Sequence, residues 1–448
     1  MGTDLVVRDG RIVLPEGIIQ GELSIENGMI KRIALTGIPK GDQEIRARGR
    51  LVMPGVVDGH AHFYSRKYVY RESFRTGSIA AAAGGVTTVG VSPLDYPINT
   101  VARAQEIIRT GESSSMVDFI LHAGNITPGF ARNLVKLASM GIRSFKVSNC
   151  FPSPCTYEGM EKVMDLAARL ECIVIAYPED AALLKELRKK MMREGKRDIL
   201  AYVQGHPPEA EERGITRISE LASRVGCPVH IAPVTTASGC RAVSKFKEMR
   251  SRITSETCPH YLTFTLKDLE RLGARLKVAP PVREADDRSA LWEAVESGLI
   301  DIITSGHAPT TRAEKEMGKI NVWGTPSGVP SLETMLPVMF TEGVVKGRIT
   351  VERLVALLSS RPAQLFGIYP RKGVIREGSD ADLVLLDVRN EMRIRAENLH
   401  YPVEWTPYEG MRVRGIPFMT LSRGEVIMRE GIVESSGGRG KFLKRGES

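Results

Sequence analysis

Alternating apolar and polar residues indicate β-structure at both ends of the chain. The stretches DLVVRDGRIVL and ELSIENGMIKRIAL each contain two apolar runs, separated by Asp9-Gly10 and by Asn27-Gly28. These dipeptides accept the positive φ of a tight turn, so each stretch is predicted to be a β-hairpin. The far end repeats the pattern in ADLVLLDV and IPFMTLSRGEVIMREGIV. We therefore expect one small β-sandwich domain, built from residues 1–50 and 364–436.

Between these ends, short apolar runs alternate with segments of helical periodicity. Runs such as SFKVSN and CPVHIAP are each preceded by a helical stretch such as ARNLVKLASMG or RISELASRVG. Some eight such units over about 310 residues predict an α/β fold, a (β/α)₈ TIM barrel over residues 51–363. In that fold, reactive side chains lie at the C-terminal ends of the strands. An open doubly wound sheet is the alternative, but no GxGxxG motif follows a first strand.

Charge and cysteine content change this picture little. The formal net charge is +9, yet Lys and Arg are spread along the chain without an aromatic-interleaved stripe, so no nucleic-acid partner is expected. Part of the excess lies in GRGKFLKRGES, so residues 437–448 are predicted to form a basic, flexible tail. The six cysteines contain no CxxC pair and are expected to be free thiols. No run of eighteen apolar residues and no signal-like N-terminus occur, so we expect no membrane partner and a cytoplasmic location.

The motif MPGVVDGHAHF, residues 53–63, carries the sharpest chemical signal. His60 and His62 lie two positions apart on an extended segment, so both imidazoles point to one face. A strand end can present two such nitrogens to one metal. Because the HxH pair follows PGxxD where the hairpins give way to helix–strand units, it indicates a metal site rather than two polar strand residues.

With ESFRTGSIAAAAGGVTTV, SFKVSNCF, ETCPHYLTF, APPVR and TSGHAPT, this motif resembles the cyclic amidohydrolases: hydantoinase (dihydropyrimidinase), allantoinase and dihydroorotase. The resemblance covers nearly the whole chain, and residues 326–387 are most similar to hydantoinases. It implies a TIM barrel with a β-sandwich made from both termini. It also implies hydrolysis of a C–N bond in a small cyclic amide or ureide, by a hydroxide bound to divalent metals such as zinc. We further expect a homo-oligomer.

The resemblance also assigns site residues. It implies that His60 and His62 are metal ligands and that Lys146 in SFKVS is the lysine that bridges two metals after carboxylation. A lysine at the end of an apolar strand can alternatively snorkel or form a buried ion pair. Arg283 in APPVR and Tyr64, which stands where dihydroorotases have an Arg, are the candidate substrate contacts. A solvated loop arginine is the alternative for Arg283.

Three positions depart from the family pattern. Tyr177 and Pro233 stand where the family has two further histidine ligands, and Gly306 in SGHAP stands where it has the aspartate that acts as general base. Neither Pro nor Gly has a side chain for those tasks. The metal site is therefore predicted to hold one metal or none, and carboxylation of Lys146 is not expected.

Neighbouring residues offer little replacement. His230 and His307 lie at odd offsets from the vacant positions, so their imidazoles should face the other way. Glu179 lies two residues from Tyr177 and shares its face if the strand continues through Pro178. Two functions stay open: a cyclic amidohydrolase with altered or lost activity, or a non-catalytic homologue that acts as a scaffold or partner subunit. No catalytic residue is assigned.

Overall fold

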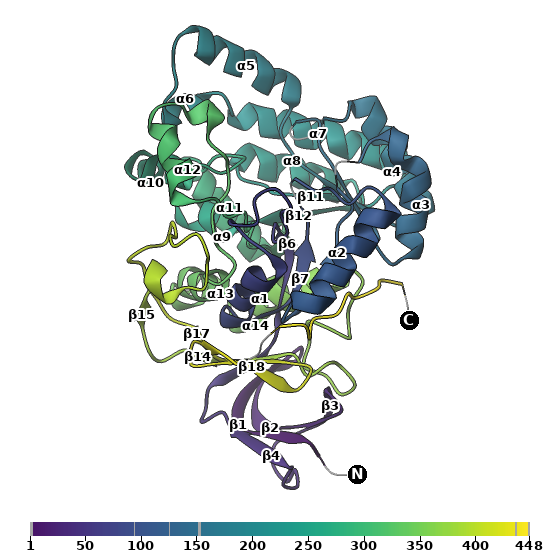
Figure 1. Cartoon of the computed structure of the whole chain (residues 1–448), viewed down its shortest axis with the longest axis vertical. Coiled ribbons are helices and arrows are strands. Elements are labelled where there is room, and N and C mark those ends of the chain that lie inside the picture. The colour runs from purple at the N-terminus through teal and green to yellow at the C-terminus, as the bar shows by residue number, and fades with distance from the viewer. Residues whose placement is uncertain (1–2, 94, 125, 151–153, 435–436, 447–448) are drawn as a thin grey trace.

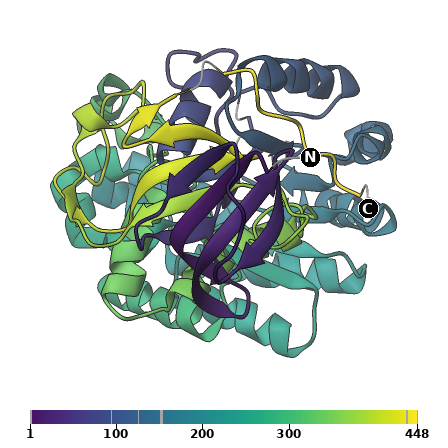
Figure 2. The ribbon, with the colours of Figure 1, turned by 90° about the horizontal axis from the view of Figure 1, so that it is seen from below.

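The computed structural model describes residues 3–434 and 437–446, apart from residues 94, 125 and 151–153. Figure 1 shows a barrel surrounded by helices above a smaller sheet domain. Seen from below in Figure 2, strands from the start of the chain lie beside strands from its last third, and together they cover one end of the barrel. Within the described residues, no helix combines the length and apolar character needed to cross a membrane.

The barrel consists of parallel strands that alternate with helices along the chain, as the periodicity predicts. Its strands are β6 (Val56–Ala61), β7 (Val86–Val91), β8 (Asp118–Leu121), β9 (Ser144–Val147), β10 (Ile173–Ala176), β11 (Val229–Ile231), β12 (Ile253–Thr257) and β13 (Ile302–Ile303). Strands β6 to β8 pair in one group and β9 to β13 in another. Single bridges join the groups, Ala61 to His307 on one side and Ala123 to Phe145 on the other.

Polar capping residues start several of the helices that surround the barrel. Thr100, Thr156 and Thr236 each accept a hydrogen bond from a backbone N–H in the first turn of the helix that follows. The longer helices are α1 (Phe74–Ala83), α2 (Val101–Ser114), α3 (Ala131–Ser139), α4 (Tyr157–Arg169), α5 (Ala181–Arg193), α7 (Pro208–Arg224), α8 (Ala237–Glu248) and α11 (Ala285–Ser297). The shorter helices are α6 (Ile199–Gln204), α9 (Pro259–Thr263), α10 (Leu266–Leu272), α12 (Arg312–Glu316), α13 (Met335–Met339), α14 (Val351–Val355) and α15 (Arg361–Leu365).

The sheet domain is built from both ends of the chain, as predicted. Its strand order is β19-β18-β17-β14-β5-β1-β2-β3, with β4 paired to β1. The strands are β1 (Leu5–Leu14), β2 (Gly17–Glu26), β3 (Met29–Ala34), β4 (Gln43–Arg46), β5 (Leu51–Pro54), β14 (Leu383–Asp387), β17 (Ile416–Ser422), β18 (Glu425–Arg429) and β19 (Ile432–Val433). A separate pair is formed by β15 (Met392–Arg393) and β16 (Arg412–Val413). The antiparallel pairing of β5 with β14 joins the two halves, so residues 51–54 lie in the sheet and the barrel begins at β6.

One of the two predicted hairpin turns is wrong. Asn27-Gly28 does turn the chain from β2 to β3, with both residues at positive φ. Asp9-Gly10, in contrast, lies inside the continuous strand β1, where Asp9 has φ 57° and the register to β2 shifts. The positive φ is used for a β-bulge rather than a reversal. A Cβ on Gly10 would lie 2.7 Å from Val52 Cγ2, so the bulge brings the backbone close to β5.

The segment predicted to be a flexible basic tail is ordered along residues 437–446. Leu443 and Arg445 are buried against the barrel, and Phe442 forms a bridge with Phe119 of β8. The basic composition predicted a solvated segment, but the side chains of Leu443 and Arg445 are buried.

A buried ion cluster fastens the sheet domain to the barrel. Lys372 is fully buried, and its Nζ lies 2.6 Å from Asp118 of β8, 2.8 Å from Asp380 and 2.7 Å from Asp382. Arg423 also pairs with Asp118. Arg371 pairs with Asp380, so Lys372 shares these carboxylates with two arginines. The cluster joins both parts of the chain at the end of the barrel where the strands begin.

We expect Lys372→Met to destabilise the protein strongly, because it leaves buried carboxylates without their cation. The expected loss in the free energy of unfolding is roughly 3–5 kcal/mol, measured by denaturant titration. Arg412→Met is the matched control, since the Arg412–Glu391 pair is exposed; there the change should stay within about 1 kcal/mol. Equal losses in the two variants would contradict the role assigned to the cluster.

Candidate functional site

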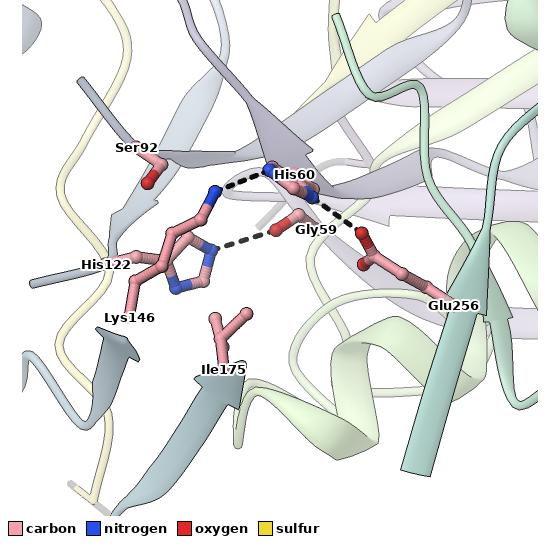
Figure 3. A pocket seen from close by; sticks show the side chains of 7 residues that line it. All are labelled: Gly59, His60, Ser92, His122, Lys146, Ile175 and Glu256. Carbon is pink, nitrogen blue, oxygen red and sulfur yellow. Dashed lines mark hydrogen bonds and ion pairs between the residues drawn. The ribbon is translucent and has the colours of Figure 1, made fainter. Parts of the chain in front are cut away.

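A chain of hydrogen-bonded side chains lies at the C-terminal ends of the barrel strands (Figure 3). Lys146 of β9 and Glu256 of β12 both contact His60 of β6. The distance from Lys146 Nζ to His60 Nε2 is 2.7 Å, and that from His60 Nδ1 to Glu256 Oε1 is 2.6 Å. Three strands that are distant in sequence therefore place an amine, an imidazole and a carboxylate in contact.

The chemistry of these groups fixes the direction of each hydrogen bond. A lysine ammonium can only donate, so His60 Nε2 accepts and His60 Nδ1–H donates to Glu256. The second oxygen of Glu256 accepts from His230 Nε2–H at 3.0 Å, and His230 Nδ1 lies 2.9 Å from Thr254 Oγ1. Glu256 thus holds two imidazoles, each in a defined tautomer.

Burial and charge shift the pKa values of this chain in opposite directions. Burial lowers the pKa of Lys146 to about 8. Burial alone would raise the pKa of Glu256, but the adjacent His60 and His230 outweigh it and hold that pKa well below its usual range. The carboxylate is therefore ionised at neutral pH, and it pairs with the positive end of the chain through His60.

The structure brings together His60, His62 and Lys146, the two histidines of the strand-parity argument and the lysine that the resemblance implies. The His62 ring lies 5.2 Å from the His60 ring, and His62 Nδ1–H donates to the carbonyl of Ser92. Burial, and then the charge of Lys146, lower the pKa of His62 well below its usual value. His62 is therefore neutral at physiological pH.

The structure shows the surroundings of Tyr177, Pro233 and Gly306, the three positions predicted to depart from the family pattern. Gly306 has φ 57°, and a Cβ there would lie 2.8 Å from Cys258 Sγ and 3.2 Å from His260 Cε1. The side chain of Pro233 has no atom that could bind a metal. The Tyr177 hydroxyl donates to Glu179, and burial raises the pKa of Tyr177 well above its usual value, so it does not form a phenolate.

These residues do not fit a two-metal centre. Among the described residues, no group of three or more His, Cys, Asp or Glu side chains is arranged to hold a metal. His60 and His62 supply two imidazoles, but the His60 Nε2 lone pair already accepts from Lys146. Tyr177, Pro233 and Gly306, at which the resemblance led us to expect the remaining ligands, present no imidazole or carboxylate for a second metal.

The candidate substrate contacts lie outside the hollow at the site. That hollow is too narrow to admit a water molecule and is lined by Gly59, His60, Ser92, His122, Lys146, Ile175 and Glu256. Arg283 is buried, and its Nη2 lies 3.7 Å from Glu179 and 3.6 Å from Glu211, so it faces carboxylates. Tyr64 is half-buried and packs against Phe74.

The neighbouring side chains considered as replacements are also engaged elsewhere. His307 Nε2 lies 2.9 Å from Glu72 Oε2, so its ring is bonded to that carboxylate. Glu179 pairs with His206, whose Nδ1 is 3.0 Å away. His230 does not line the hollow, but it contacts Glu256 and thereby belongs to the hydrogen-bonded chain, which parity alone did not indicate.

Sequence reasoning missed Glu256 and His122, which both line the hollow. Glu256 stands in the quoted motif ETCPHY, and His122 follows the apolar run of VDFILHAG. Each is a polar residue at or just after the C-terminal end of a barrel strand, β12 for Glu256 and β8 for His122, and that position was the available signal.

The chain is similar to known proteins along nearly its whole length. A family model described as "Amidohydrolase family" matches residues 51–427. An L-hydantoinase from Paenarthrobacter aurescens is 34% identical over 451 residues, which cover 99% of this chain and 98% of that protein. An allantoinase from Rubrobacter xylanophilus is 34% identical over 455 residues, which cover 98% and 97%. The solved structure of an L-hydantoinase (dihydropyrimidinase) from Arthrobacter aurescens has a TM-score of 0.96 and 32% identity, covering 99% of this chain and 100% of that one.

The buried His260 should make stability depend on pH. Burial lowers the pKa of His260 to about 3, and its Nδ1 has no hydrogen-bond partner among the described residues. An unfolded chain binds that proton near pH 6.5, so the free energy of unfolding should fall as pH drops from about 6.5 towards 3. The slope from this group is at most about 1.4 kcal/mol per pH unit.

His260→Gln should flatten this acid limb in denaturant titrations at several pH values. Above about pH 7, where His260 is neutral in both states, the two profiles should run parallel, which provides the internal control. If His260→Gln leaves the pH dependence of the free energy of unfolding unchanged below pH 6.5, the low pKa of His260 does not cause the acid destabilisation.

Proposed function

The chain belongs to the amidohydrolase family, and on that premise we propose that it hydrolyses a C–N bond of a small cyclic amide or ureide. The reaction would take place at the C-terminal mouth of the barrel, at a site with fewer metal ligands than the family pattern. The observation that carries the proposal is the chain Lys146–His60–Glu256, which presents a charged donor in a hollow where this fold places its chemistry.

Ring opening adds water across the amide bond. The water oxygen bonds to the carbonyl carbon, the C–N bond breaks, and the ring nitrogen takes up a proton. The carbonyl oxygen carries negative charge in the transition state, and a fixed cation beside it lowers the barrier. With a pKa of about 8, Lys146 is mostly charged at pH 7 and suits this role, while His60 and Glu256 fix its position.

Among the described residues, the lining of the hollow includes one carboxylate, Glu256, and it is not free to act as a base. Glu256 is committed to two imidazoles, and position 306 has no side chain. General base catalysis typically contributes about 10²–10⁴ in rate, so we propose slow turnover. A site of this kind takes at most one divalent metal, such as zinc, on His60 and His62, and that metal would have to displace Lys146 from His60 Nε2. Lys146 would stay uncarboxylated, because a carbamate anion would need cations that these residues do not gather.

A second candidate function is a non-catalytic homologue that acts as a scaffold or partner subunit. It is favoured by the replacement of three family positions by Tyr177, Pro233 and Gly306. Homo-oligomerisation and a cytoplasmic location belong to either proposal, and light scattering of the purified protein tests the former. Arg283 and Tyr64 would contact a ring only after rearranging, because neither lines the hollow.

We expect hydrolysis of dihydroorotate, allantoin and simple hydantoins to be very slow, with at most one zinc bound per chain. Steady-state assays with zinc and bicarbonate, together with metal analysis, measure both quantities. Turnover of any of these rings at about 1–10³ s⁻¹, or two zinc ions per chain, would show that the reduced site is misassigned. Turnover absent from every ring tested, with the fold intact, would favour the non-catalytic alternative.

Restoring the family pattern should raise metal binding and ring hydrolysis. The changes are Tyr177→His, Pro233→His and Gly306→Asp. We expect them to raise zinc binding and turnover only together with Cys258→Ala, because a Cβ at 306 would lie 2.8 Å from Cys258 Sγ. Since the base alone is typically worth about 10²–10⁴ in rate, a matched variant with Gly306→Asn in place of Asp should bind zinc but turn over more slowly by that order. Equal rates in the two variants would remove the argument about the missing base.

A further inference from the structure

A cleft of about 230 Å³, which we term the interdomain cleft, lies between the barrel and the sheet domain. Glu333 and Pro337 of the barrel form one side of it, and β15, β17 and the turn between β18 and β19 form the other. The elements α13, β15 and β17 lie close together in Figure 1. The hollow at the candidate site does not admit a water molecule, whereas the interdomain cleft has room for a small ligand.

Much of the lining of this cleft is apolar. It includes Pro337, Met392, Leu399 and Phe418. The Phe418 ring is held from one side by Arg50, whose Cζ lies 3.7 Å from the ring centre. Because an apolar cavity of about 150 Å³ can take up benzene, the interdomain cleft can receive a group of the size of a phenyl ring.

Most charged groups of the lining are already paired. His400 Nδ1 lies 3.0 Å from Glu333 Oε1, and Arg395 Nη1 lies 3.5 Å from Glu409 Oε1. Asp387 accepts hydrogen bonds from two backbone N–H groups of the turn that follows it. These groups therefore need no charge from a ligand.

Arg393 and Glu430 are the two charged exceptions. Among the described residues, neither side chain forms a hydrogen bond or ion pair, and the uncharged Asn398 beside them also lacks a partner. Arg393 lies directly opposite Arg412 in the β15–β16 pair, and the carboxylate nearby, Glu391, pairs with Arg412. Like charges directly opposite each other repel, so an anion beside Arg393 is favoured. The cleft thus combines one free cation, one free anion and an apolar space.

We propose that the interdomain cleft binds a free α-amino acid with an apolar side chain. Its carboxylate pairs with the Arg393 guanidinium, which only donates, and its ammonium pairs with the Glu430 carboxylate, which only accepts. The apolar side chain occupies the space beside Phe418. This proposal does not depend on whether the protein hydrolyses rings.

The two free charges distinguish an amino acid from other small ligands. A simple carboxylic acid would leave Glu430 unpaired, and a simple amine would leave Arg393 unpaired. An uncharged apolar compound would fill the space beside Phe418 but would use neither charge. A probe that lacks one charge therefore reports on one residue of the pair.

The first test is isothermal titration calorimetry of the full-length protein with three probes. They are L-phenylalanine, 3-phenylpropionate, which lacks the ammonium, and 2-phenylethylamine, which lacks the carboxylate. We expect L-phenylalanine to bind tightest and each of the others to bind at least about threefold more weakly, as for loss of one partly exposed ion pair. Absence of L-phenylalanine binding, or equal affinity for all three probes, would overturn the proposal.

Variants of the two charged residues give a crossed pattern. Arg393→Gln should weaken L-phenylalanine and 3-phenylpropionate by at least about threefold and leave 2-phenylethylamine unchanged. Glu430→Gln should weaken L-phenylalanine and 2-phenylethylamine and leave 3-phenylpropionate unchanged. Both side chains are exposed, so the Tm of the free protein should not change. Lys31→Gln is the matched control, because Lys31 is an exposed cation of the sheet domain outside the cleft.

Two further outcomes would contradict the proposal. If both variants bind the three probes as the wild type does, Arg393 and Glu430 do not recognise the ligand. If no probe binds and light scattering shows a dimer that Phe418→Asp dissociates, a second copy of the chain covers the cleft instead.

Discussion

The cost of burying charge governs both ends of this barrel. At the end where the strands begin, Lys372 pairs with three aspartates, together with Arg423 and Arg371, and thereby joins the sheet domain to β8. At the opposite end, Glu256 is ionised inside the barrel only because His60 and His230 donate to it. Each buried ion fixes several side chains around it, so the geometry of the site and the docking of the two domains both follow from the need to pair charge in a medium of low dielectric constant.

This constraint also explains why the altered positions form a consistent arrangement. The space beside Gly306 is taken by Cys258 and His260, and Tyr177 is committed to Glu179, which in turn pairs with His206. The residues that differ from the family pattern are therefore supported by their neighbours. A single substitution towards that pattern would place the new side chain among neighbours that pack against the present residue. The effects of these substitutions on stability and activity should therefore not be additive.

The fold could be predicted from sequence because its signals are local. Hydrophobic periodicity indicated the helix–strand alternation, and the similarity of the two ends indicated a shared sheet. Asp9-Gly10 misled because a positive φ serves a bulge as well as a turn. Strand parity predicted that His60 and His62 share a face, and the family resemblance added Lys146 to them. Glu256 was missed because its partners are distant in sequence: His60 lies 196 positions away, and nothing local to ETCPHY indicates that contact.

The pairing of residues 439–446 with β8 has a consequence for the synthesis of the chain. Residues 439–446 follow all the barrel strands in the chain, yet they pair with β8, which is made far earlier. While the ribosome is still adding the later strands, the edge of β8 has only β7 as a full partner. One edge of β8 therefore stays unpaired until residues 439–446 have been synthesised. Exposed strand edges of this kind are sites where chaperones bind or chains aggregate.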